Sequence, residues 1–230
     1  MSLALVRANQ LIDATGHGAV LILAADTYLN RTTITEHLAA RRLLATDIRA
    51  GFIPGEAAGA LLITRTDARN GVELRVFGHG AATEFALPEN TAPLRADGMT
   101  QAVKLALHDA DSTIDELSVL ISDASGEDYS FEQLGLVQQR TGSTMPLWLP
   151  AETVGETGSA VGCLQIAWWM EAHRKVYLTG NGALLMASND AGQCTATILA
   201  YHFSDAYVAS AIDPTTIIRD TIRKDGTNGA

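Results

Sequence analysis

Positive charge is scarce in this chain of 230 residues. Its 16 Lys and Arg residues are outnumbered by 26 Asp and Glu residues, which gives a formal net charge of −10, and the basic residues form no run. Binding to a nucleic-acid backbone needs clustered positive charge to neutralise phosphates. The composition therefore argues against a nucleic-acid partner.

Cysteine is scarcer still, since Cys163 and Cys194 are the only two in the sequence. Two cysteines cannot build a disulfide framework or a metal site with several Cys ligands. The six histidines are scattered, and none lies three or four residues from another, so a histidine metal site is not expected either. We expect no metal and no cofactor.

Long apolar runs and targeting signals are also missing. No apolar stretch reaches the ~18 residues that a membrane-spanning helix needs. The first residues, MSLALVRANQLIDATGHG, lack the pattern of a secretory signal. The zinc-protease, P-loop, CxxC and hydrolase-elbow motifs are absent as well. These absences predict a soluble, cytoplasmic globular protein without a membrane partner.

What the sequence does contain is an alternation of helical and strand-like segments. Helices are expected at residues 3–13, 34–45, 99–110, 131–140 and 160–173, of which 3–13 and 99–110 are amphipathic and 160–173 is strongly apolar. Strands are expected at 19–25, 57–64, 72–78, 117–121, 145–149, 176–178, 182–188 and 194–202. The runs 19–25 and 57–64 are continuously apolar, which is typical of central strands covered on both faces. Helices interleaved with buried strands predict an α/β layered architecture.

Two acidic segments are candidate sites. Residues 123–128 (DASGED) follow a predicted buried strand, where α/β sheets usually place their chemistry. Glu156 precedes the small residues 158–162 at a predicted helix start, where the helix dipole and free amides would stabilise an anion. We therefore favour a capping role for Glu156, which would make it a poor proton donor.

Four segments follow one another in an order that points to one family. They read GFIPGEAAGALL at 51–62, DASG at 123–126, GETGSAVG at 155–162 and SNDAGQCTA at 188–196. In that order they resemble the GFxxGEGAGxLVLE stretch, the HGTGT position, the GHxxGAAG turn (one residue shorter here) and the closing NSFGFGGTNA loop of β-ketoacyl synthases. These are condensing enzymes of the thiolase superfamily.

The resemblance implies a fold and a domain organisation. The fold would be the thiolase-like layered α-β-α architecture, with part of the first half and the complete second half present. Residues 1–80 would be the remnant of the first half, 81–98 a crossing or linker, 99–211 the second half and 212–230 a polar tail. The family's cysteine nucleophile lies upstream of the part that this chain matches, in the half that the chain lacks.

The departures from the family pattern concern catalysis. The family uses two histidines to assist decarboxylation and to stabilise an enolate oxygen; Asp123 stands at the first of these positions and Glu156 at the second. An ionised carboxylate repels a developing oxyanion, and losing even one donor costs about 10²–10³ in rate. Neighbouring carboxylates would also raise the thiol pKa of Cys163 or Cys194, which disfavours a substitute nucleophile. The resemblance therefore implies a degenerate site with no expected catalytic residue.

Two functions remain open at this point. The favoured one is a non-catalytic partner or acyl- or carrier-protein-binding module, because a chain with only part of one half would leave a sheet edge and an apolar face uncovered. The partner would be another thiolase-fold chain, a second copy or a missing N-terminal half. The alternative is an acyltransferase or thioesterase that acts on acyl thioesters with Asp123 and Glu156 as acid and base.

A cleft inherited from the family would bind an acyl carrier protein or a coenzyme A thioester. Its lining is expected from the glycine-rich turn and the closing loop. The expected binding residues are Gly126, Gly155, Gly158, Asn189, Gly192 and Cys194.

Overall fold

The computed structural model describes residues 1–16, 18–65, 72–90, 92–177 and 180–203. Residues 1–65 and 76–200 form one compact unit, and residues 66–75 with 201–230 form a second. Of the second unit only residues 72–75 and 201–203 are described, and they are the outer ends of two strands. The predicted polar tail at 212–230 lies outside the described residues.

Two sheets are present in the described part of the chain. β1 (Ala19–Thr27) and β2 (Glu56–Thr64) pair along their whole length in an antiparallel two-stranded sheet. The second sheet has five strands in the order β3-β7-β6-β4-β5. β4 is parallel to β5 and β6, and β6 is antiparallel to β7. These strands are β3 (Val72–Thr83), β4 (Val119–Ser122), β5 (Leu147–Trp148), β6 (Gly182–Ser188) and β7 (Gln193–Phe203).

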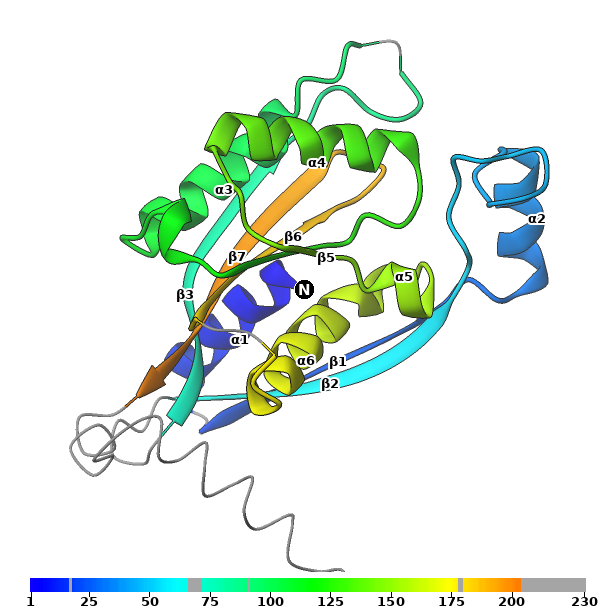
Figure 1. Ribbon diagram of the computed structural model, residues 1–230. Coiled ribbons are helices and arrows are strands. Elements are labelled where there is room, and N and C mark those ends of the chain that lie inside the picture. The colour runs from blue at the N-terminus through cyan, green and yellow to red at the C-terminus, as the bar shows by residue number, and fades with distance from the viewer. Residues whose placement is uncertain (17, 66–71, 91, 178–179, 204–230) are drawn as a thin grey trace, which may run out of the picture. The chain divides into compact units, whose positions relative to one another are not determined.

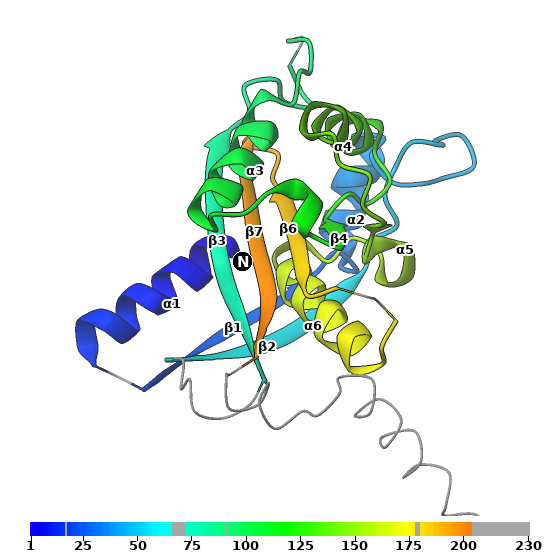
Figure 2. The same ribbon diagram turned by 60° about the vertical axis from the view of Figure 1, so that its left-hand side comes forward.

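Helices form layers with these sheets (Figures 1 and 2). The helices are α1 (Ser2–Thr15), α2 (Arg31–Ala39), α3 (Asp97–Asp109), α4 (Asp128–Thr141), α5 (Ala151–Val154) and α6 (Val161–Arg174), with short 3₁₀ turns η1 (Ile114–Glu116) and η2 (Gly158–Ala160). α3 packs on β6 and on α4, α6 contacts both β6 and β2, and α1 contacts β1 and β2. α1 and α6 therefore lie between the two sheets. None of the helices in the described residues is long and apolar enough to span a membrane.

The main hydrophobic core lies between the five-stranded sheet and the α3–α4 layer. Leu184 and Met186 of β6 are 1% and 2% exposed, and they pack in one cluster with side chains of α3 and α4 such as Val103 and Leu134. Because successive strand residues point to opposite faces, the intervening residues of β6 point to the α1–α6 layer. The sheet is thus covered on both faces, as predicted for the second half.

Close packing on the inner side of the two-stranded sheet depends on a glycine. A Cβ atom on Gly59 of β2 would lie only 2.5 Å from the Cβ atom of Cys163 in α6. Cys163 is 3% exposed and packs as a small hydrophobic residue, as its place in an apolar helix predicts. The glycine therefore sets how closely β2 and α6 approach.

The outer side of this sheet differs from the prediction. The two strands alternate half-buried and exposed residues, and neither contains a buried residue. Leu21, Leu23 and Leu62 on the exposed face are 57%, 71% and 65% accessible. The expectation of strands covered on both faces is thus wrong within the described residues, where only the α1–α6 side carries a packed layer.

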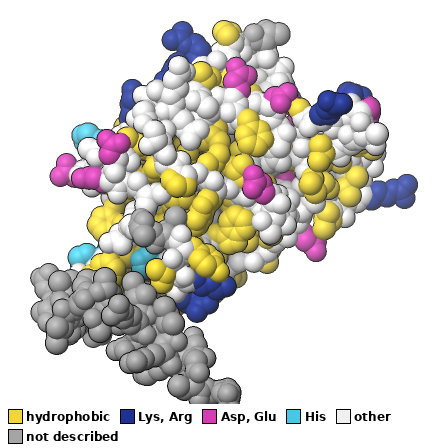
Figure 3. Space-filling model, in the orientation of Figure 1, with side chains coloured by type: hydrophobic (Ala, Val, Ile, Leu, Met, Phe, Trp, Pro, Cys, Tyr) yellow, Lys and Arg dark blue, Asp and Glu magenta, His cyan; other side chains and the backbone are white. Residues whose placement is uncertain are grey.

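Three other elements depart from the sequence expectation. The predicted helix at 34–45 ends at Ala39, and the apolar residues that follow, such as Leu43, are buried in an irregular segment. α2 itself contributes no buried residue, and Figure 3 shows hydrophobic side chains exposed over this region. β3 continues to Thr83, into the predicted crossing. The strand expected at 176–178 is wrong at Val176, which lies in a turn after α6, and residue 178 lies outside the described residues.

Candidate functional site

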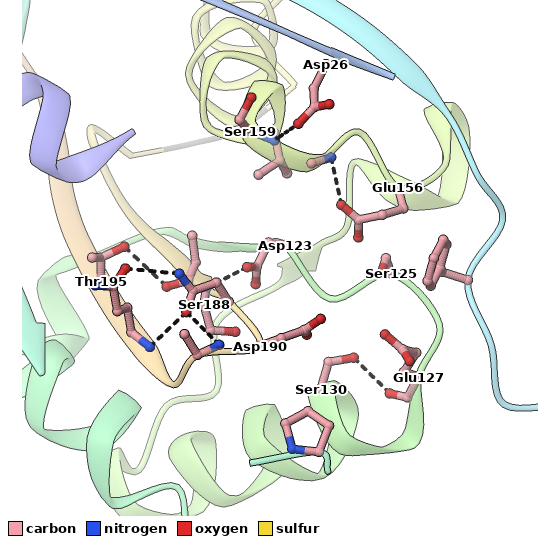
Figure 4. A pocket seen from close by; sticks show the side chains of 18 of the residues that line it. Asp26, Asp123, Ser125, Glu127, Ser130, Glu156, Ser159, Ser188, Asp190 and Thr195 are labelled. Carbon is pink, nitrogen blue, oxygen red and sulfur yellow. Dashed lines mark hydrogen bonds between the residues drawn. The ribbon is translucent and has the colours of Figure 1, made fainter. Parts of the chain in front are cut away.

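A cavity of about 640 Å³ opens where the ends of several helices and strands meet (Figure 4). Its walls come from the start of α1, the end of β1, the segment around α2, the loop after β4, the start of α6 and the β6–β7 turn. Its lining includes six acidic and basic side chains. They are five carboxyl groups and one guanidinium: Asp26, Asp123, Glu127, Glu156, Asp190 and Arg42. The cavity therefore carries a surplus of negative charge.

Asp123 follows β4 directly and links it to the β6–β7 turn. Its Oδ2 accepts the backbone N–H of Ser188 at 2.6 Å, and its own N–H donates to the carbonyl of Met186 at 3.2 Å. The pKa of Asp123 is raised to about 7, chiefly by burial and also by the negative charge of Glu156, while the Ser188 hydrogen bond opposes the shift. Near neutral pH this carboxyl group therefore exists in both protonation states.

Glu156 lies in the loop between α5 and η2 and acts as a cap. Its Oε1 accepts the backbone N–H of Gly158 at 2.8 Å. Its backbone is pinned to the segment before β2, because its N–H donates to the carbonyl of Ile53 at 2.7 Å and its carbonyl accepts from Gly55 at 2.9 Å. This is the capping role that the helix-start pattern predicts.

Asp26 supplies a second carboxylate to the same turn. Its Oδ2 accepts the backbone N–H of Ser159 at 2.9 Å, and this hydrogen bond lowers the pKa of Asp26 despite an opposing effect of burial. Two carboxylates from distant segments thus bind successive amides of η2, the turn that leads into α6. Anions in that position are stabilised by free N–H groups and by the helix dipole.

Arg42 joins three segments on the other side of the cavity. Its guanidinium donates to both oxygens of Glu127, at 2.7 and 2.8 Å, and to both oxygens of Asp190, at 2.6 and 3.1 Å. These hydrogen bonds raise the pKa of Arg42, in spite of its partial burial. Because its guanidinium hydrogen bonds are made to Glu127 and Asp190, Arg42 is paired within the protein.

An aromatic cluster lies beside Arg42. The ring of Tyr28 stacks on His37, and both rings meet Phe52 edge to face, with centroid distances of 5.1 to 5.6 Å. Tyr28 and Phe52 line the cavity, and burial raises the pKa of Tyr28 with help from nearby carboxylates. These residues form the apolar part of the wall.

The structure brings together only some of the residues expected from the sequence. Asp123, Glu156, Gly158 and Asn189 all line the cavity. Figure 4 shows Asp123 and Glu156 there. Asn189 shapes the β6–β7 turn, since its Oδ1 accepts the N–H groups of Ala191 and Gln193. The expected Asp123 and Glu156 positions therefore do share one cavity.

The other expected binding residues are not among those that line the cavity. Gly126, Gly155 and Gly192 have positive φ angles of 129°, 74° and 79° and are not among the lining residues. Cys194 is 1% exposed in the core beside Gln133, and burial raises the pKa of its thiol to about 12. The structure thus gives Cys194 a packing role where the sequence predicted a binding role, because its side chain points to the α3–α4 side of the sheet.

Sequence reasoning missed Asp26, Arg42 and Asp190. Asp26 lies 133 residues from its partner Ser159 in the sequence. Arg42 lies 85 residues from Glu127 and 148 residues from Asp190. Such pairs leave no local pattern. The one available signal was the position of Asp26 at the end of an apolar strand, next to the glycine-rich segments in the predicted fold.

The cavity offers no thiol nucleophile and no imidazole base in the part of the chain that the structure describes. Neither a cysteine nor a histidine is among its lining residues. Within the same described residues, no group of three or more His, Cys, Asp or Glu side chains is arranged to hold a metal ion.

Comparisons with known proteins give no match to a protein-family model and no significant match to a curated protein. Solved structures, in contrast, match over most of the chain. A structure of a ketosynthase in complex with its chain length factor from Xenorhabdus doucetiae matches with a TM-score of 0.74 and 20% identity, covering 87% of this chain and 57% of the other. A β-ketoacyl synthase from Burkholderia phymatum matches with a TM-score of 0.66 and 17% identity, covering 86% and 58%.

A third match is a structure of a type II polyketide-synthase acyl-carrier protein in complex with its ketosynthase, with a TM-score of 0.69, 13% identity and coverage of 86% and 60%. The chain therefore spans less than two thirds of the length of the ketosynthase structures that it matches. The chain has the thiolase-like ketosynthase fold that its glycine-rich segments resembled.

Proposed function

We propose that the protein is a ketosynthase-like subunit that does not condense acyl thioesters itself and that works as the partner of another thiolase-fold chain. One observation carries the proposal. The two positions that correspond to the family's histidines are Asp123 and Glu156, both line one cavity, and no imidazole or thiol lines it in the described residues.

The electrostatics of the cavity support this proposal. Condensation passes through an enolate whose oxygen must be stabilised by hydrogen-bond donors or positive charge. Here the carboxylates outnumber the single guanidinium, and Arg42 is already paired with Glu127 and Asp190. The oxygens of Glu156 and Asp26 accept backbone N–H groups that could otherwise act as donors. Negative charge on a ligand would therefore be disfavoured in this cavity.

The proposal of a partner rests on the fold and on its exposed surface. One matched structure is a ketosynthase with its chain length factor, which is a pair of different chains, and another holds a carrier protein. In this protein the two-stranded sheet leaves Leu21, Leu23 and Leu62 exposed. Apolar surface of this kind marks an interaction site. A carrier protein or a coenzyme A thioester as ligand belongs to the same proposal.

The experiment is an acylation and condensation assay on the purified chain. The protein is incubated with acetyl- and malonyl-coenzyme A and, separately, with the same groups on an acyl carrier protein. Intact-mass spectrometry is expected to show no covalent acyl adduct, and product analysis no β-ketoacyl thioester. An adduct on the chain, or a condensation product above the protein-free blank, would overturn the proposal.

A second candidate is an acyltransferase or thioesterase with Asp123 as acid and Glu156 as base. The raised pKa of Asp123, about 7, favours it, because a protonated carboxyl can donate a hydrogen bond or a proton. Hydrolysis of acyl thioesters that falls as pH rises through about 7, and that Glu156→Gln abolishes, would support this function. Glu152→Gln is the matched control, since Glu152 lies on α5 and does not line the cavity.

A further inference from the structure

Two links join the segment after β4 to the β6–β7 turn. The inner link is the hydrogen bond that Ser188 donates to Asp123, whose pKa is raised by burial. The outer link passes through Arg42, which donates to Glu127 at the start of α4 and to Asp190 in the turn. The side chain of Asp190 is 59% exposed, and those of Arg42 and Glu127 are 24% exposed. The outer link therefore lies on the solvent side of the inner one.

The outer link also ties both of these segments to residues 40–55. Apart from hydrogen bonds to α2, the backbone hydrogen bonds that leave residues 40–55 go to Tyr28 and Glu156. Among the described residues, no backbone hydrogen bond joins residues 40–55 to the start of α4 or to the β6–β7 turn. The side chain of Arg42 is thus the hydrogen-bonded connection between these three parts of the cavity wall.

Arg42 is held in place from below. Its backbone N–H donates to the carbonyl of His37 and its own carbonyl accepts from Phe52, both at 2.9 Å. Its guanidinium carbon lies 5.8 Å from the ring centroid of Phe52, a residue that is 1% exposed. A cation over an aromatic face is attracted by the ring, and the contact limits the freedom of the side chain. The guanidinium is therefore preorganised for its carboxylate partners.

The orientation of Glu127 serves Arg42 and not the helix that it begins. Glu127 is the N-cap residue of α4, but its side chain makes no capping hydrogen bond. Both of its carboxylate oxygens accept from Arg42 instead. A capping side chain stabilises a helix by about 1 kcal/mol, which α4 does not gain from this residue. Asp190 is similar, because the side-chain hydrogen bonds within its turn are made by Asn189.

We infer that Arg42, Glu127 and Asp190 form a clasp across the mouth of the cavity, and that its release loosens the start of α4 and the β6–β7 turn together and admits a ligand to the inner link. Residues 189–191 at the tip of the turn are all exposed. Segments with few buried contacts open locally at a low cost in free energy. The inference goes beyond the proposed function, because it holds for any ligand that the cavity binds.

Native-state hydrogen exchange, followed by NMR on the full chain, tests the joint loosening. The amides of Gly192 in the turn and Phe131 in α4 are hydrogen-bonded to the carbonyls of Asn189 and Glu127. Arg42→Met should speed exchange at both amides by about tenfold, because hydrogen bonds to charged groups are lost. Arg41→Met is the matched control and should leave both within about twofold. Unchanged exchange at either amide in the Arg42→Met variant would overturn the inference.

Single substitutions at the two carboxylates separate a clasp from two independent ion pairs. Asp190→Asn should speed exchange at Phe131 across the cavity mouth, and Glu127→Gln should speed exchange at Gly192, each by at least about threefold. Exchange of the core amide of Leu184, a residue that is 1% exposed, shows that each variant remains folded. Effects confined to the substituted segment would overturn the inference.

Thiol labelling tests access to the cavity. Ser125→Cys places a reporter in the cavity lining between Asp123 and Glu127, whereas the native Cys163 and Cys194 are only 3% and 1% exposed. Addition of Arg42→Met should speed labelling of this reporter by a bulky maleimide by about tenfold, and addition of Arg41→Met should not. Equal rates in the two backgrounds would overturn the inference. Because no thioester is used, failure here leaves the proposed function standing, and thioester turnover leaves these results unaffected.

Discussion

The carboxylate of Asp123 accepts the backbone N–H of Ser188 at 2.6 Å, so the loop after β4 is tied to the β6–β7 turn across the wall of the cavity. The two residues are 65 positions apart in the sequence. This link places Asp123 in the same cavity as Glu156, and the proximity of the two carboxyl groups contributes to the raised pKa of Asp123.

The raised pKa of Asp123 predicts a pH dependence of stability. The folded protein holds this proton up to about pH 7, whereas an unfolded Asp releases it near 3.8. The free energy of unfolding contributed by this group therefore falls as pH rises from about 4 to about 7. Asp123→Asn keeps an acceptor for Ser188 and removes the charge, so it should stabilise the protein by about 2 kcal/mol at pH ~8 and by little at pH ~4. Urea unfolding at the two pH values measures this, and equal effects at both would contradict it.

The capping carboxylate of Asp26 should show the opposite dependence. Its pKa is lowered by the hydrogen bond from Ser159, so its stabilising contribution is present above the ordinary pKa of 3.8 and is lost as pH falls below that value. Asp26→Asn is expected to lower the melting temperature at neutral pH. The difference from wild type should shrink towards pH ~3, which thermal unfolding followed by circular dichroism can detect. A difference independent of pH would mean that the charge is unimportant.

The two neighbouring arginines should differ in their effect on stability. The side chain of Arg42 is 24% exposed and holds Glu127, also 24% exposed, together with Asp190. Arg42→Met would leave these carboxylates without a partner and should cost about 1–3 kcal/mol in the free energy of unfolding. Arg41 pairs with Asp47 at the surface, with side chains 64% and 72% exposed, so Arg41→Met should cost less than about 0.5 kcal/mol. Similar losses in chemical denaturation would contradict this prediction.

Glycine substitutions test the packing of β2 on α6. A Cβ atom at Gly59 would lie 2.5 Å from the Cβ atom of Cys163, and Gly59→Ala should therefore destabilise the protein by about 1–3 kcal/mol. Gly135 lies inside α4 with nothing within 4 Å of the corresponding position. Gly135→Ala should stabilise the protein by about 0.5–1 kcal/mol. Opposite signs in the same unfolding assay are the expected result, and a neutral Gly59→Ala would show that the layers can separate at little cost.

Local patterns in the sequence were sufficient to predict most elements of the fold. The apolar helix at 160–173 corresponds closely to α6 (Val161–Arg174), and the run 57–64 corresponds to β2. The apolar character of 19–25 and 57–64 predicted burial on both faces, whereas the structure covers one. The hydrophobicity of a strand indicates that both of its faces are suited to burial, but it does not show which residues pack against them.

The candidate site was predictable only where a family motif marked it. Asp123 and Glu156 follow from their positions in two glycine-rich segments, and both line the cavity. Arg42 could not be recognised, because its two carboxylate partners come from distant loops that only the folded chain brings together. The strand expected at 176–178 shows a different kind of error, because a local pattern predicted a strand that the described residues do not form. Val176 lies in the turn after α6, with a φ angle of 57°.

Release of labelled carbon dioxide from a malonyl thioester tests the central claim most directly. Under the proposed function, a cavity lined by Asp123 and Glu156, with no imidazole in the described residues, does not supply the donors that stabilise the enolate formed by decarboxylation. We predict that the purified chain releases carbon dioxide no faster than the protein-free blank between about pH 6 and about pH 8. Release well above the blank that is lost in Asp123→Asn or Glu156→Gln would contradict the account.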